Sequence, residues 1–355
     1  MIASLLIDWY ASHRRELPWR ETNDPYKIWI SEIILQQTRI AQGLSYYLRF
    51  IEHFPDVKSL AESEESEVLK YWQGLGYYSR ARNLHATAQT IVNQYKGEFP
   101  ADFKQIKALK GIGDYTAAAI ASIAFKLPYA AVDGNVYRVL SRLFEIKTPI
   151  DSTKGKKEFF ELAQELLDKK NPHLFNQAMM DLGAMICLPT NPICTECPLQ
   201  LVCMSKQNGN YAEFPIKEKK TKQKDRYFLY LLLHDKGKIY LHHRTKNDIW
   251  KGLYEFPMVE LNEPLWEKEI DLTLQTFEKE FRLISIENLT PMPNHILSHQ
   301  VIHSFFIEAK GELLKKEITT YIAINENEIE NYAIPRLVEL YLEKREKQHN
   351  KNNPL

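Results

Sequence analysis

All four cysteines of the chain lie between residues 187 and 203, and this clustering constrains the fold more than any other feature. Cys187, Cys194, Cys197 and Cys203 are separated by six, two and five residues. Four thiolates that converge on one point can hold an iron–sulfur cluster or a tetrahedral zinc ion. Prolines interrupt the segment, so we expect a looped strap around a ligand rather than a helix.

Two disulfides, or a structural zinc, would also use four clustered cysteines. The first apolar run, Ala3 to Ile7, is broken by Asp8 and preceded by no basic residue, so we expect no signal peptide. Without an oxidising compartment, clustered cysteines favour a metal over disulfides. The spacing alone favours a cluster over zinc only slightly, because Cys194 and Cys197 form the single short Cys-x-x-Cys pair.

The length of 355 residues and a change of pattern beyond the cysteines indicate two domains. Residues 1–206 have the apolar spacing of helices, and residues 227–347 contain strand-like runs joined by turns. Between them, 207–226 is polar and lysine-rich, as linkers are. The segment 348–355 is predicted to be a disordered tail. The expected fold is a mainly α domain that ends in the strap at 187–203, then a smaller α/β domain.

Several elements are predicted by periodicity and turn residues. They are helices over Val136–Phe144 and Lys156–Leu167, strands over Tyr227–Leu233, Lys238–His242 and Ile302–Ile307, a hairpin turn at Asp235–Gly237, and a closing helix over Asn331–Lys347. No apolar run approaches the length that spans a membrane. The net charge is zero, with a slight basic excess before residue 250, which mildly favours an anionic partner for the first part.

A carboxylate lies in the middle of an apolar helix. Asp24 suits an N-cap and Pro25 suits the first helical position. The next turns, up to Leu35, are almost wholly apolar, so most of the helix circumference is expected to be buried. Burial of Glu32 would raise its pKa and give it the profile of a general acid. The alternative is a glutamate on one exposed stripe of the helix.

Two glycines and a second carboxylate follow. Gly111 and Gly113 open a helix of small residues, where backbone N–H groups can receive a phosphate. The preceding Asp102–Leu109 can supply the first helix of a helix–hairpin–helix. Asp133 stands just before another predicted helix, where it is either an ordinary N-cap or an anion aimed at a substrate cation. Spacing alone does not decide between these two roles.

In combination, these features resemble the helix–hairpin–helix DNA glycosylase superfamily, and within it the adenine DNA glycosylases of MutY type. The motifs that carry the resemblance are Leu17–Arg20, Ser31–Thr38, Gly74–Asn83, the hairpin at Gly111, Val132–Asn135 and the cysteine strap. In that family the same cysteine spacing binds a [4Fe–4S] cluster. The resemblance therefore implies this cofactor, held by Cys187, Cys194, Cys197 and Cys203.

The resemblance also implies catalytic roles. Glu32 would protonate N7 of a flipped adenine, Asp133 would stabilise the oxocarbenium-like sugar, and Asn135 would support Asp133. Tyr115 stands where the endonuclease III branch has a lysine that forms a Schiff base. A phenol cannot form an imine, so we expect a monofunctional glycosylase without lyase activity.

Other matched residues are expected to contact DNA. Gln37, Leu75 and Tyr77 match residues that wedge into the duplex beside the orphaned base. A further set is assigned to substrate or DNA binding: Arg20, Gly111, Gly113 and Asp181. Asp181 departs from the glutamate that the family generally has.

The second domain resembles the MutT-like (Nudix-fold) module that reads 8-oxoguanine. It lacks the Arg-Glu-x-x-Glu-Glu helix that a pyrophosphatase needs for its metal, so we expect recognition rather than hydrolysis. Ser298 and His299 match the family's recognition loop, while Leu297 replaces its aromatic residue. An alternative places His295, His299 and His303 on one face of a helix.

The sequence thus predicts a repair glycosylase that removes adenine opposite 8-oxoguanine or guanine in double-stranded DNA. It is expected to act as a monomer in the bacterial cytoplasm, at the nucleoid, with no membrane partner. Two alternatives are an endonuclease III-like bifunctional glycosylase/lyase and a non-catalytic iron–sulfur DNA-binding protein.

Overall fold

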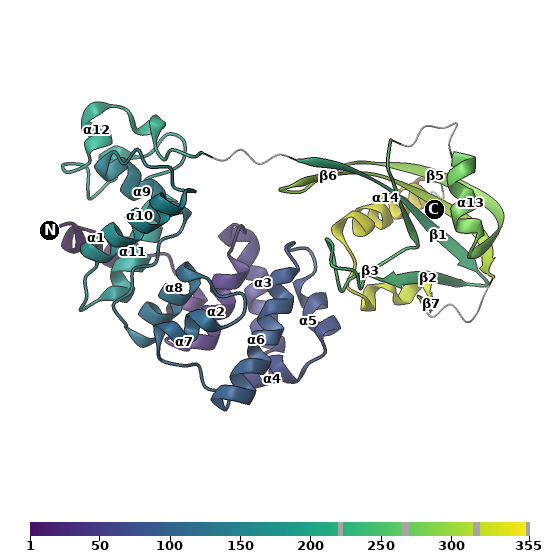
Figure 1. Cartoon of the computed structure of the whole chain (residues 1–355), viewed down its shortest axis with the longest axis horizontal. Coiled ribbons are helices and arrows are strands. Elements are labelled where there is room, and N and C mark those ends of the chain that lie inside the picture. Colours follow the sequence, from purple (N-terminus) through teal and green to yellow (C-terminus); the bar gives the residue numbers. More distant parts are fainter. Residues whose placement is uncertain (219–222, 265–269, 315–319, 353–355) are drawn as a thin grey trace. The chain divides into compact units, whose positions relative to one another are not determined.

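The computed structural model describes residues 1–218, 223–264, 270–314 and 320–352. They form two compact units (Figure 1). The first unit holds Met1–Glu62 and the described chain from Asn83 to residue 218, and the second holds Ser63–Arg82 and the described chain from residue 223 onward. Residues 219–222 of the predicted linker and 353–355 of the predicted tail lie outside the described residues.

The first unit is helical. Its elements are α1 (Ile2–His13), η1 (Pro18–Arg20), α2 (Pro25–Ile34), α3 (Ile40–His53), α4 (Val57–Glu62), most of α6 (Ser79–Tyr95), α7 (Phe103–Ala108), α8 (Asp114–Phe125), α9 (Gly134–Phe144), α10 (Thr153–Leu166), α11 (Pro172–Met185), η2 (Cys194–Glu196), α12 (Met204–Asn208) and η3 (Tyr211–Glu213). The predicted helices over Val136–Phe144 and Lys156–Leu167 are confirmed as α9 and α10, with α10 starting earlier.

One apolar core holds α1, α9, α10 and α11 together. Leu6, Leu140, Phe159 and Phe175 are completely or almost completely buried in it. Three of the four cysteines pack against this core. The strap contains only one 3-10 turn, η2, so the looped segment predicted from its prolines is confirmed.

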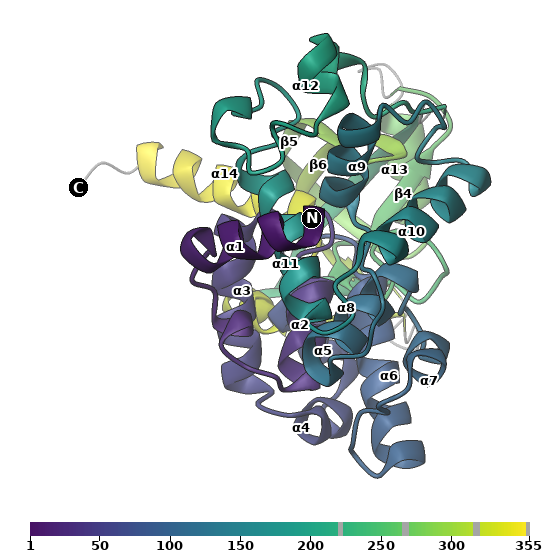
Figure 2. The same cartoon turned by 90° about the vertical axis from the view of Figure 1, so that its left-hand side faces the viewer.

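The buried helix that carries Glu32 begins as predicted. The Asp24 carboxylate accepts a hydrogen bond from the Tyr26 backbone N–H at 2.9 Å, and Pro25 occupies the first turn of α2. Every residue from Ile28 to Ile34 is buried. Helix α2 packs on α8, and α11 packs on α8 and α1 (Figure 2). This packing brings together the two helices that carry Glu32 and Tyr115.

The second unit combines a mixed sheet with helices. Its elements are α5 (Glu65–Trp72), the start of α6, β1 (Lys224–Asp235), β2 (Lys238–His243), β3 (Tyr254–Glu255), β4 (Met258–Leu261), α13 (Ile270–Glu278), β5 (Phe281–Ile296), β6 (Gln300–Leu313), β7 (Tyr321–Asn325), η5 (Glu326–Asn331) and α14 (Arg336–Asn352). The strand order is β3-β2-β1-β6-β5, with β4 paired to β1 and β7 to β2. Strands β1 and β6 are parallel, and the other pairs are antiparallel.

Strand β1 is apolar on both faces because helices cover both. Leu229 and Leu231 pack in the core that contains Phe277 of α13. On the opposite face, Tyr230 stacks on Phe306, which stacks on Tyr341 of α14 with ring centroids 4.0 Å apart. A strand whose two faces are both buried needs a continuous apolar run, and in β1 this run is Phe228 to Leu233.

The predicted strands and the β1–β2 hairpin are confirmed. Lys236 and Gly237 both have positive φ, as the two central residues of a tight hairpin turn require. The three-histidine helix is wrong: His295 lies on β5, His303 on β6, and His299 in the turn between them.

The C-terminal helix differs from its prediction. It starts at Arg336, after a proline, and continues to Asn352. Residues 348–352 of the predicted disordered tail are therefore helical. Part of the predicted linker is also structured, because Phe214 is buried and the Ile150 backbone N–H donates to the Ile216 carbonyl at 3.0 Å. Among the described residues, no helix is both long enough and apolar enough to cross a membrane.

Candidate active site

The first unit contains a cavity of about 800 Å³ between η1, α2, α8, α11 and the start of α9. Six of the residues predicted to act in catalysis or substrate binding line it: Arg20, Glu32, Gln37, Tyr115, Asp133 and Asn135. They come from segments that are far apart in the sequence. The packing of α2 on α8, of α8 on α11 and of α11 on α9 therefore places the predicted catalytic residues around a single cavity.

Glu32 is the buried acid of this cavity, with an exposed fraction of 9%. The Tyr115 hydroxyl donates a hydrogen bond of 2.6 Å to its Oε2. Burial raises the pKa of Glu32 from 4.5 to about 7, and the nearby charge of Asp133 adds to this, while the Tyr115 hydrogen bond and Arg20 oppose it. A carboxyl group with this pKa holds a proton for much of the time near neutrality and can donate it.

Asp133 serves as a helix cap and also lines the cavity. Its carboxylate accepts hydrogen bonds from the Asn135 and Val136 backbone N–H groups at 2.9 and 2.8 Å, and from Asn135 Nδ2 at 2.8 Å. Burial raises the pKa of Asp133 above its ordinary value, while these three donors favour the charged form. Asp133 can therefore act both as the N-cap of α9 and as an anion that faces a substrate cation.

Arg138 belongs to the same wall and was missed by the sequence predictions. Its guanidinium donates to Asn135 Oδ1 at 2.9 Å, to the Gly183 carbonyl at 2.7 Å and to the Cys187 carbonyl at 2.7 Å. It thereby fixes the asparagine that holds Asp133. The one signal in the sequence was its position three residues after Asn135 on the same helix.

The prediction that Asp181 contacts the substrate does not fit its position. Its side chain has an exposed fraction of 0% and does not line the cavity. It forms ion pairs with Arg15 and Arg20 instead. Burial alone would raise the pKa of Asp181, but hydrogen bonds and charges from both arginines hold it below its ordinary value. Asp181 thus orients two arginines that reach the cavity wall.

The glycine hairpin between α7 and α8 requires glycine at one position. Gly111 has φ of 79°, and a Cβ there would come within 2.7 Å of Asn83 Cβ. Gly113 precedes the first turn of α8, and no side chain caps that end of the helix. Backbone N–H groups at a helix start suit an anion such as a phosphate.

The four cysteines line one small pocket together with Arg142 and Lys206, and all four are free thiols. Arg142 donates to Cys187 Sγ at 3.4 Å and to the Leu188 and Pro189 carbonyls. Among the residues that the structure describes, no three His, Cys, Asp or Glu side chains are grouped closely enough to hold a single metal ion. Because all four thiols are free, the alternative of two disulfides is not the arrangement found.

The second unit contains another pocket, of about 500 Å³. Leu75, Tyr77, Ser298 and His299 line it, and the Tyr77 and Ser298 hydroxyls are hydrogen-bonded. Leu75 is buried, with an exposed fraction of 8%, whereas Tyr77 is 45% exposed. Of these two residues, which were predicted to wedge into the duplex, only Tyr77 is exposed enough to contact DNA. Gln37, the third, lies in the cavity of the first unit.

Comparisons with known proteins define the class. Residues 30–169 match the family model described as the HhH-GPD superfamily base excision DNA repair protein, and residues 228–344 match the NUDIX domain. A solved thermostable thymine-DNA glycosylase superimposes on 58% of this chain and 95% of its own, with a TM-score of 0.54 and 32% sequence identity. The first unit is thus a helix–hairpin–helix base excision repair fold.

Two curated relatives narrow the assignment. The adenine DNA glycosylase of Buchnera aphidicola subsp. Acyrthosiphon pisum is 35% identical over 306 residues, which cover 85% of each chain. The human adenine DNA glycosylase is 40% identical over 211 residues, which cover 57% of this chain and 39% of the human protein. The chain belongs to the adenine DNA glycosylase family, and it is an adenine-specific glycosylase of base excision repair.

Proposed function

We propose that the cavity of the first unit receives an adenine rotated out of the duplex, and that Glu32 and Asp133 catalyse its release. Extrusion is necessary because the N-glycosidic bond cannot be reached inside the base stack. The observation that carries the proposal is the protonatable Glu32, hydrogen-bonded to Tyr115 and lining the same hollow as Asp133.

The proposed reaction divides the work between two carboxyl groups. Glu32 donates its proton to N7 of adenine, which makes the base a neutral leaving group as the bond to the sugar breaks. The sugar then carries positive charge, which the Asp133 carboxylate stabilises. Water attacks the sugar carbon and loses a proton. This follows the two-carboxylate logic of glycoside hydrolysis, and Tyr115 holds Glu32 in place.

We propose that the base opposite adenine is 8-oxoguanine or guanine, and that the second unit reads it. Its pocket presents the Ser298 hydroxyl and the His299 imidazole next to Tyr77. Both can bond to polar edges of a purine. The NUDIX-matching segment has no Arg-Glu-x-x-Glu-Glu helix, which supports recognition rather than hydrolysis.

We also propose how the duplex is held. The N–H groups after Gly111 and Gly113 would receive a phosphate, while Gln37 and Tyr77 would fill space in the duplex. Gln37 and Tyr77 both adopt positive φ, an uncommon conformation for residues with side chains. One chain carries both the cavity and the pocket, so we propose a monomer that acts on chromosomal DNA in the cytoplasm.

We propose that the cysteine strap holds a [4Fe–4S] cluster. Four thiols line one pocket, and the cationic Arg142 and Lys206 beside them suit the negative charge of thiolates. Such a cluster would cross-link parts of the strap to one another, and three of its four cysteines pack on the core that contains residues of α9 and α11.

Replacing Cys203 by Ala should lower the iron content and the visible absorbance of the purified protein, because one of four ligands is lost. The strap packs on the main core of the first unit, so its melting temperature should fall by several degrees. Cys203→Ser retains a weaker ligand, so its iron content and melting temperature should lie between those of Cys203→Ala and the wild type. Stoichiometric zinc with no iron in the wild-type protein would contradict the cluster assignment.

A set of duplexes with adenine opposite 8-oxoguanine, guanine, cytosine or thymine tests the proposed substrate. Single-turnover release should be fastest opposite 8-oxoguanine, slower opposite guanine, and slowest opposite the two pyrimidines. The same reactions run with borohydride should give no trapped protein–DNA complex, because Tyr115 cannot form a Schiff base. Equal release from all four duplexes would refute the mispair proposal, and trapping would refute the monofunctional mechanism.

A further inference from the structure

Two bulky aromatic residues of the second unit have an unusual backbone conformation, and both line its pocket. Tyr77 has φ of 47° and Trp250 has φ of 59°. Left-handed φ is rare for bulky side chains and persists where the surroundings enforce it, often at functional sites. No other aromatic residue among those that the structure describes has positive φ.

The position of Trp250 is enforced by its own loop. The Arg244 backbone N–H donates to the Leu253 carbonyl at 2.9 Å, and the Gly252 N–H returns to the Arg244 carbonyl at 2.7 Å. The Leu253 N–H also donates to the Trp250 carbonyl at 3.0 Å. These bonds close a tight loop between β2 and β3. The loop holds the indole against the pocket.

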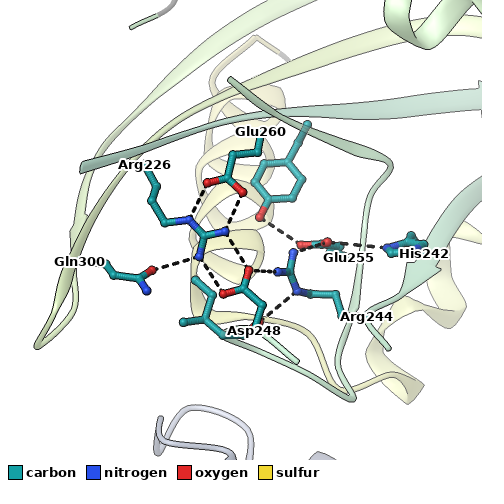
Figure 3. Close-up of polar contacts among 9 residues, drawn as sticks. Arg226, His242, Arg244, Asp248, Glu255, Glu260 and Gln300 are labelled. Atoms are coloured by element: carbon teal, nitrogen blue, oxygen red, sulfur yellow. Dashed lines mark hydrogen bonds and ion pairs between the residues drawn. The ribbon is translucent and has the colours of Figure 1, made fainter. Parts of the chain in front are cut away.

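A network of ion pairs joins this loop to β1, β3 and β4 (Figure 3). Asp248 accepts hydrogen bonds from Arg226 at 2.7 and 2.9 Å and from Arg244 at 3.0 Å. Arg226 also binds Glu260, and Arg244 binds Glu255 at 2.6 Å and the Ile249 carbonyl at 3.1 Å. Both arginines are buried and each pairs with two carboxylates, so neither buried cation is left without a partner.

The same loop supplies part of the pocket wall. Asp248, Ile249 and Trp250 all line the pocket, and the Trp250 ring lies 5.9 Å from the His295 ring, centroid to centroid. Trp250 has an exposed fraction of 8%, so its indole is packed into the wall of the pocket. Leu297, by contrast, offers no aromatic face at the turn that carries Ser298.

We propose that Trp250 is a specificity-determining residue, whose indole packs against the purine opposite adenine, and that Asp248 is the positioning residue that sets the indole. This rests on the proposed role of the pocket in reading that purine. A flat ring that faces an aromatic wall while Ser298 and His299 bind its polar edge would be recognised by both shape and hydrogen bonding. Trp250 thus provides the aromatic surface that Leu297 does not.

The test compares affinity for duplexes that carry a non-cleavable adenine analogue opposite 8-oxoguanine or guanine. Trp250→Leu should weaken binding to the 8-oxoguanine duplex about tenfold, as loss of base–aromatic packing does, and change binding to the guanine duplex much less. Trp250→Phe should retain most of the preference. Asp248→Asn should shift the preference in the same direction as Trp250→Leu, by a smaller factor.

Phe256→Leu is the matched control, because Phe256 is fully buried in the same unit but does not line the pocket. It should lower the melting temperature and leave the ratio of the two affinities unchanged. A wild-type ratio in folded Trp250→Leu, together with a reduced ratio in Ser298→Ala, would overturn this inference alone. A wild type without preference for 8-oxoguanine would instead overturn the proposed role of the pocket.

Discussion

Glu32→Gln is expected to slow adenine release about a thousandfold, the size of effect that general acid catalysis provides. The amide has nearly the same shape and can still accept the Tyr115 hydrogen bond, but it has no acidic proton to give to the base. Binding of the mispaired duplex should stay within about threefold of the wild type, since the cavity keeps its size. Single-turnover release and equilibrium binding measure the two quantities separately.

Glu52→Gln is the matched control for this substitution. Glu52 lies exposed on α3, away from the lining of the cavity, so the same chemical change should leave release unaltered. Release by Glu32→Gln within tenfold of the wild type would show that another group donates the proton. Loss of binding along with loss of release would show that Glu32 holds the duplex rather than acting on the base.

The same proton gives the rate a pH dependence of defined sign. Glu32 is active when protonated, and its pKa is raised to about 7 by burial. Release should therefore be fast below about pH 7 and fall about tenfold per pH unit well above it. At low pH a second limb should appear, because Asp133 must be ionised to stabilise the sugar. The residual release by Glu32→Gln should no longer fall as the pH rises through neutrality.

Asp133→Asn is expected to reduce release by a hundredfold to a thousandfold, which is typical when a charge that stabilises a transition state is lost. Asparagine is as good an N-cap as aspartate, so the start of α9 should be preserved. Asp133→Ala should lose the charge and the cap together, and about 1 kcal/mol of the free energy of unfolding with them. Thermal unfolding and single-turnover release on both variants separate the two roles.

Removal of this charge should also alter the pH profile. The carboxylate of Asp133 contributes to the raised pKa of Glu32, so in Asp133→Asn the limb near neutrality should move to lower pH. An unshifted limb would mean that the two groups do not interact across the cavity. Release that is unchanged in Asp133→Asn would mean that another group stabilises the sugar.

The parts of the site that could be predicted from sequence are those with a strong local pattern. Glu32 stood out because every neighbour on α2 was apolar, and α2 is buried as that pattern requires. The cysteines were predicted to converge from their spacing, and they line one pocket. Asp133 was found by its place before a helix, although sequence could not separate a cap from a catalytic anion.

Features that depend on tertiary contacts could not be predicted. Asp181 lies in a motif that matches a substrate-binding residue of the family. Its carboxylate nevertheless binds Arg15 and Arg20, which are more than 160 residues away in the sequence, and does not line the cavity. Trp250 gave no signal either, because its backbone conformation is set by hydrogen bonds and ion pairs rather than by a turn motif. Residue type alone does not encode such constraints.

The parallel pairing of β1 with β6 has a consequence for synthesis of the chain. Lys224 to His234 pair with Gln300 to Lys310, so a central strand emerges from the ribosome long before its partner. Until then its leucines and its backbone lack that neighbour, and unpaired apolar strands invite association between chains. Any shortened product that ends before residue 300 would carry this exposed strand permanently, and would be a target for chaperones and proteases.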